Sequence, residues 1–145
     1  MINQRRTGRL AVFGGIVLSL GLAGIATTWV NILDRGPLMA ELGIHYSRYL
    51  PTRIEIPAGV PLTIALRNDD PIDHEWIVGD SAVHGRHRSG TEPVHGTRAT
   101  EVSVPAGRTR TTTVTFAQPG TYLYICHLPG HEAYGMVGTL VVTED

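Results

Sequence analysis

Short β-rich segments separated by regularly spaced turns run from about Ile44 to the end of the chain, and this pattern restricts the fold more than any other feature. Pro and Gly recur roughly every ten residues, with β-branched residues clustered between them. The turn Pro57-Ala58-Gly59 is repeated at Pro105-Ala106-Gly107. No segment after residue 30 repeats its apolar residues with a helical period. The pattern predicts an all-β sandwich of short strands.

The alternation of polar and apolar residues places the strands. Leu62, Ile64 and Leu66 fall on one face of a segment because side chains alternate along a strand. The predicted strands are 53–56, 62–68, 74–79, 101–104, 111–116, 121–126 and 138–142.

The segment 80–100 interrupts this pattern and carries His84, His87 and His95. We interpret it as a long solvated loop with scattered histidines. The alternative, which we favour less, is a second and weaker metal site or a docking face.

The first thirty residues differ from the rest. Residues 1–9 hold three arginines and no acid, and residues 10–30 are uncharged and apolar. This predicts a signal anchor, or less favourably a cleaved signal peptide, because the run is about long enough to cross a bilayer as a helix. The positive flank predicts that everything after it lies outside the cytoplasm. We expect residues 31–43 to be a linker or short helix and residues 44–145 to form the exported domain.

The overall charge and the single cysteine restrict the classes of partner and of site that the chain could have. The formal net charge is −1, and no basic stripe is interleaved with aromatic residues, so we expect no nucleic-acid partner. Cys126 is the only cysteine. In an exported chain a lone thiol is a liability unless something uses it.

A metal site would make use of the lone Cys126 thiol. Cys126, His131 and Met136 are spaced five residues apart between two predicted strands, so they can converge on one ion. A second imidazole is needed, and His74, at the start of a strand, is the candidate. Thiolate, imidazole and thioether ligands suit copper in both oxidation states. Zinc would prefer a closed tetrahedral set, and a Cys–His nucleophile would need an activated thiolate and an oxyanion hole. We favour copper.

From about Ile44 to Thr143 the chain resembles the cupredoxins, the family of plastocyanin and azurin. The resemblance rests on the two Pro-Ala-Gly turns, on residues 119–122, which lead into the strand before Cys126, and on the loop Cys-His-Leu-Pro-Gly-His-x4-Met. It implies a Greek-key β-sandwich of seven or eight strands. It also implies one type 1 (blue) copper ion bound by His74, Cys126 and His131, with Met136 as a weak axial ligand. One-electron transfer is the usual role.

Some features depart from the family pattern. Glu75 stands where many members have Asn, which puts the reduction potential in doubt. The ligand loop also resembles the last copper motif of multicopper oxidases. There a second histidine precedes the cysteine; here that position is Ile125, and no His-x-His pair exists. We therefore expect no oxidase activity from this chain alone, and we interpret His127 as a surface or supporting histidine.

The leading hypothesis is an electron carrier whose redox partners dock weakly near His131, with no catalytic residues and no small-molecule substrate. One alternative is a copper delivery or storage module at the outer membrane face. Another is an accessory domain that donates electrons to an oxidase or nitrite-reducing complex. The sequence leaves both alternatives open.

Overall fold

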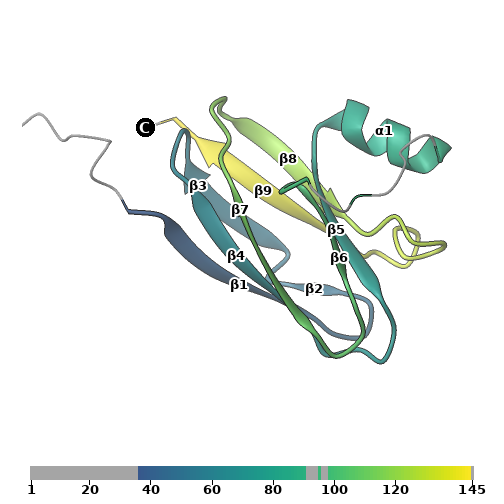
Figure 1. Cartoon of the computed structure of the whole chain (residues 1–145). Helices are drawn as coiled ribbons and strands as arrows, with labels where there is room; N and C mark the ends of the chain where they lie inside the picture. Colours follow the sequence, from purple (N-terminus) through teal and green to yellow (C-terminus); the bar gives the residue numbers. More distant parts are fainter. Residues whose placement is uncertain (1–35, 91–94, 96–97, 145) are drawn as a thin grey trace, which may run out of the picture. The chain divides into compact units, whose positions relative to one another are not determined.

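The computed structural model describes residues 36–90, 95 and 98–144, which form a two-layer β-sandwich (Figure 1). The predicted N-terminal helix lies outside the described residues. The strands are β1 (Leu38–Ile44), β2 (Tyr49–Leu50), β3 (Arg53–Pro57), β4 (Leu62–Asn68), β5 (His74–Gly79), β6 (Glu101–Val104), β7 (Thr109–Val114), β8 (Gly120–Ile125) and β9 (Val137–Thr143). One helix, α1 (Ser81–Ser89), follows β5. Among these residues, no helix is long and apolar enough to cross a membrane.

The two layers are a four-stranded sheet in the order β2-β1-β4-β7 and a five-stranded sheet in the order β3-β9-β8-β5-β6. β1 pairs in parallel with β4, and β3 in parallel with β9, while the other pairs are antiparallel. Alternation decides which side chains enter the core: Leu62, Ile64 and Leu66 of β4 are each at most 1% exposed. The all-β sandwich predicted from the sequence is therefore confirmed.

Two buried tyrosines hold the part of the core next to the start of β5. The rings of Tyr49 and Tyr124 meet edge to face with centroids 5.2 Å apart. The Tyr49 hydroxyl donates to the Glu75 carbonyl, and the Tyr124 hydroxyl donates to the Pro51 carbonyl at 2.8 Å. Each buried aromatic or aliphatic side chain contributes about 1.5–3 kcal/mol from burial. The start of β5 is therefore tied to both a tyrosine pair and the sheet.

The prediction that residues 31–43 form a linker or short helix is wrong for residues 38–43, which belong to β1. Leu, Met, Ala and Glu are good helix formers, which obscured the alternation. In the sandwich Leu42 and Ile44 are fully buried, and the strand pairs with β4 along its whole length. Long-range pairing outweighs local propensity here.

The prediction of a solvated loop over 80–100 is also wrong for its first half, which forms α1. The Asp80 carboxylate accepts hydrogen bonds from the amides of Ala82 and Val83, and Gly90 closes the helix in a left-handed conformation. α1 has a weak apolar face, so periodicity did not reveal it. It lies over the end of β5 (Figure 1) and approaches closely, since a Cβ on Gly79 would lie 2.7 Å from Val83.

Candidate metal centre

The loop between β8 and β9 is folded back on itself by its own backbone. The Cys126 amide donates to the Met136 carbonyl at 3.2 Å, and the Met136 amide donates to the His131 carbonyl at 3.0 Å. Gly130 and Gly135 adopt positive φ angles of 85° and 87°, which favour glycine. These turns bring Cys126, His131 and Met136 to one end of the sandwich.

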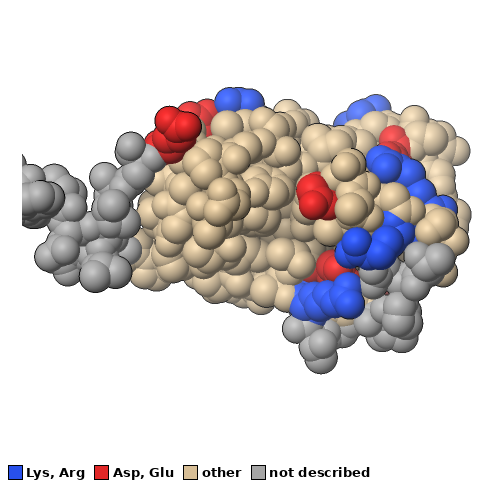
Figure 2. Space-filling view, turned by 90° about the horizontal axis from the view of Figure 1, so that it is seen from above, with Lys and Arg blue, Asp and Glu red and all other residues tan. Residues whose placement is uncertain are grey.

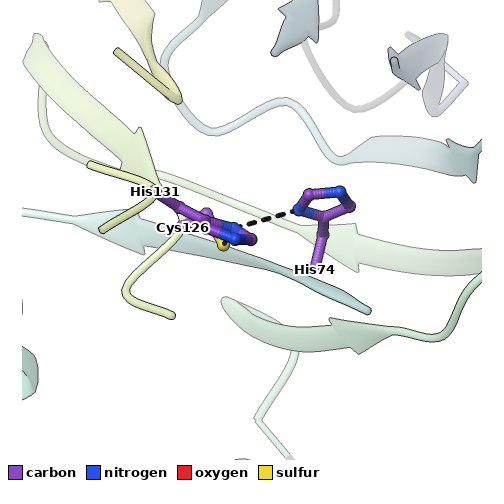
Figure 3. A group of neighbouring side chains, drawn as sticks. All are labelled: His74, Cys126 and His131. Carbon is purple, nitrogen blue, oxygen red and sulfur yellow. Dashed lines mark hydrogen bonds between the residues drawn. The ribbon is translucent and has the colours of Figure 1, made fainter. Parts of the chain in front are cut away.

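The structure places three of the four predicted ligands together (Figure 3). Nδ1 of His131 lies 3.2 Å from Nδ1 of His74 and 3.2 Å from Sγ of Cys126. His74 and Cys126 are fully buried, and His131 is half-buried. Met136 is fully buried at the end of the same loop. The site therefore combines the half-buried imidazole of His131 with the buried thiol of Cys126.

Asp70 orients His74, and sequence reasoning missed it. Nε2–H of His74 donates to Oδ2 of Asp70 at 2.9 Å, which leaves Nδ1 facing His131. The same carboxylate accepts from the amides of Tyr46 at 2.7 Å and Ser47 at 2.8 Å, two residues with φ of 52°. Burial alone would raise the pKa of Asp70, but these hydrogen bonds lower it below its usual value. The carboxylate is thus held charged behind His74.

The thiol of Cys126 is fully buried, which disfavours its charged form. Burial raises its pKa above the ordinary value, although the Glu75 amide donates to Sγ at 3.4 Å and favours the thiolate. A buried thiolate without a positive neighbour is costly, whereas a metal ion displaces the proton and stabilises it. The group therefore suits metal binding better than free nucleophilic chemistry.

The side chain of His127, the residue after Cys126, packs against His84 and His87 of α1. Its side chain is 5% exposed, and its Nε2 lies 3.0 Å from Nδ1 of His84. Burial, then the neighbouring His84, lowers the pKa of His127 to about 4. Glu132 accepts hydrogen bonds from the Arg88 guanidinium at 2.5–3.1 Å and lies 3.6 Å from His127.

The three histidines of segment 80–100 are not scattered in solvent. His84 is 1% exposed, and the side chains of His87 and His95 are 2% and 16% exposed. His87, His95 and Glu101 form a second group whose candidate ligand atoms lie within 4.8 Å of one another. The interpretation of these histidines as solvent-exposed is wrong, because His84 contacts β8, while His87 and His95 face Glu101 of β6.

The donor set of the first group fits copper. Two imidazoles and a thiolate, with a thioether available nearby, suit both Cu(I) and Cu(II), whereas structural zinc usually takes four closed thiolate or imidazole ligands. His74 already gives its other ring nitrogen to a carboxylate, an arrangement typical of metal-binding histidines.

Comparison with known proteins agrees with this chemistry. A model of the cupredoxin-like domain matches residues 34–142. Auracyanin-B of Chloroflexus aurantiacus is 31% identical over 110 residues, which cover 66% of this chain and 47% of that protein. The copper-resistant cuproprotein CopI of Pseudomonas aeruginosa is 27% identical over 126 residues, covering 65% of this chain and 70% of that protein.

The fold of this chain is also similar to that of a solved structure. Auracyanin A, described as a "blue" copper protein of Chloroflexus aurantiacus, superposes with a TM-score of 0.58 and 28% identity, covering 74% of this chain and 100% of that one. The chain thus spans about half the length of auracyanin-B and the whole of the auracyanin A structure.

Proposed function

The chain belongs to the cupredoxin-like family, and from that premise we propose that it carries single electrons outside the cytoplasm on one type 1 copper ion. His74, Cys126 and His131 would hold the copper, and Met136 would add a weaker thioether donor. The observation that carries this proposal is the convergence of three donor atoms: Nδ1 of His131 lies 3.2 Å from both Nδ1 of His74 and Sγ of Cys126, and all three atoms lie within 4.8 Å of one another.

The groups around the donors support a carrier rather than a catalyst. Asp70 holds His74, the Glu75 amide holds the Cys126 sulfur, and the backbone of the loop holds His131. When bound, copper supplies a one-electron couple between Cu(I) and Cu(II). Ligands that are fixed by a rigid β-frame move little between the two oxidation states, so each electron transfer costs little reorganisation.

We propose that redox partners dock over His131, the half-buried member of the set. A hollow of about 390 Å³ lies beside it, lined in part by Arg88, Leu128 and Pro129. Tyr134, also in this loop, is 72% exposed. Arginines gather toward the end of the described domain that carries α1 (Figure 2), and Arg86 and Arg88 belong to its last turn. Because Arg88 is paired with Glu132, the contact beside His131 is mainly apolar, which favours a small and transient interface with a redox partner.

Location outside the cytoplasm rests on the basic and apolar residues of 1–30, which favour a membrane anchor. Fractionation of cells that express the full chain tests this. Recovery of the protein in the membrane fraction, with protease sensitivity only from the outer side, is the expected result. Recovery in the cytoplasm contradicts the proposed location.

Voltammetry and stopped-flow spectroscopy test the carrier function directly. The copper-loaded protein should show a reversible one-electron wave, and an inorganic oxidant and reductant should cycle it without loss of copper. An irreversible wave, or release of copper on each reduction, would contradict the proposal.

The similarity to CopI favours a second candidate, a copper-handling role at the outer face of the membrane. That role requires copper to exchange. A Cu(I) chelator in excess separates the two functions, because a carrier retains its copper over many redox cycles whereas a delivery protein gives it up. Rapid, complete transfer to the chelator would favour copper handling.

A further inference from the structure

We propose that His87, His95 and Glu101 form a second site for a divalent transition-metal ion, next to the copper centre and distinct from it. These residues come from α1, from the segment that follows it, and from the start of β6. Their candidate ligand atoms lie within 4.8 Å of one another. Ligands around one such ion are about 3–4 Å apart when each metal–ligand distance is about 2.1 Å, so small side-chain rotations suffice.

His87 is the residue that points most directly to an ion. Its Nδ1–H donates to the Val83 carbonyl at 2.8 Å, an atom that can only accept. Its Nε2 is buried and has no hydrogen-bond partner, and it faces Oε2 of Glu101 at 3.9 Å. In its neutral form the ring aims the lone pair of Nε2 at a carboxylate across a gap too long for a hydrogen bond. A cation between the two satisfies both groups, and a carbonyl-bonded Nδ1 is typical of a metal-binding histidine.

Glu101 and His95 complete the donor set. Glu101 is 4% exposed; its Oε1 accepts from Arg98 at 2.9 Å, while its Oε2 lies 3.3 Å from Nδ1 of His95. The arginine thus occupies one carboxylate oxygen and leaves the other directed at the histidines. His95 and Glu101 also line a hollow of about 640 Å³, which gives an ion a path from solvent.

Two imidazoles and one carboxylate favour an ion of the Zn²⁺ and Cu²⁺ class over Mg²⁺ or Ca²⁺, which prefer oxygen ligands alone. Open coordination positions remain for water. The competing explanation is a charged His87 imidazolium paired with Glu101, which would need no metal. The two explanations differ in whether the protein binds an added ion at these residues.

The second site is connected to the first through Glu75 and His127. Oε1 of Glu75 lies 3.4 Å from Nε2 of His95, while the amide of Glu75 donates to Sγ of Cys126. The His127 ring stacks on His87 with centroids 5.2 Å apart, and His127 follows Cys126 in the chain. A divalent ion at the second site therefore adds positive charge beside the thiolate and should raise the reduction potential of the copper.

Calorimetric titration with Zn²⁺ tests the proposal in two backgrounds. In the full chain already holding copper, one further equivalent of Zn²⁺ should bind without loss of the copper. In a chain carrying Cys126→Ser and His131→Ala, which removes two proposed copper ligands, His87→Ala should still lower the bound Zn²⁺ by one equivalent. The second background keeps the test independent of the copper assignment.

Variants assign the Zn²⁺ to these residues. His87→Ala, and Glu101→Gln, which keeps the shape of the side chain and its contact with Arg98, should each weaken the binding by more than about tenfold. Glu55→Gln removes an exposed carboxylate on β3 and should change nothing. Circular dichroism reports whether each variant is folded. Absence of Zn²⁺ binding, or binding that both site variants leave unchanged, overturns the proposal.

Discussion

Nε2–H of His74 donates to Oδ2 of Asp70 at 2.9 Å, so this carboxylate decides which ring nitrogen of His74 is left for a metal. The two residues are four apart in the chain, across the turn that precedes β5. Asp70 is itself held by two backbone amides, from Tyr46 and Ser47. The orientation of a proposed copper ligand is therefore set by a loop on the opposite sheet.

Replacement of Asp70 by Ala should weaken copper binding by about 10–100-fold, because His74 loses the partner that fixes its tautomer and ring orientation. Competition with a chelator of known affinity measures this. Asp69→Ala is the matched control, since Asp69 is more exposed and pairs with Arg67. An equal loss of copper affinity in the two variants would show that Asp70 has no specific role.

Replacement of Met136 by Gln should lower the reduction potential, because an oxygen ligand favours Cu(II) more than a thioether does. Met136→Leu, which offers no ligand, should raise it. The Leu exchange conserves volume in a fully buried position and should cost less than about 1.5 kcal/mol of stability. Voltammetry of both variants gives the potentials, and identical values would argue against Met136 as a ligand.

Two glycines near α1 should respond in opposite directions to Ala. Gly79→Ala places a Cβ against Val83 and should destabilise the protein by about 1–3 kcal/mol. Gly85→Ala adds a methyl to an exposed position of α1 with open space around it, and should stabilise by about 0.5–1 kcal/mol. Denaturant unfolding measures both changes. A stable Gly79→Ala variant would contradict the close packing of α1 on β5.

The metal-free protein should lose stability as the pH falls below about 6.5. Burial lowers the pKa of His84, and burial followed by the His84 charge lowers the pKa of His127 to about 4. As the pH falls, these two histidines therefore bind protons in the unfolded chain but stay neutral in the folded chain. The free energy of unfolding decreases down to about pH 4 as a result. His84→Gln should make this decrease shallower. An unchanged slope in that variant would contradict a buried neutral His84.

Much of the fold could be predicted because each strand buries one face. The alternation of Leu62, Ile64 and Leu66 needs only the two-residue period of a strand. β1 was not predicted as a strand because its residues favour helix, and its pairing partner, β4, lies 24 residues farther along the chain, with Leu38 opposite Leu62. α1 had usable signals in Asp80 and Gly90, its two caps, but it lacks the apolar stripe on which periodicity depends.

The proposed copper ligands could be predicted in part because three of them are neighbours in one loop, with a spacing that few other sites share. Asp70 could not, since its role depends on amides that come from a different sheet. The pairing of His95 with Glu75 and Glu101 also has no sequence signature. It arises because His95, which follows α1, lies against Glu75 of β5 and Glu101 of β6.

The absorption and electron paramagnetic resonance spectra of residues 36–145 loaded with one equivalent of Cu(II) show whether Cys126 binds the copper. We expect an intense visible thiolate-to-copper band with narrow hyperfine splitting, and the loss of both in Cys126→Ser while circular dichroism still reports a β-fold. A pale protein with wide splitting, or a blue colour that survives in Cys126→Ser, would contradict the proposed ligand set.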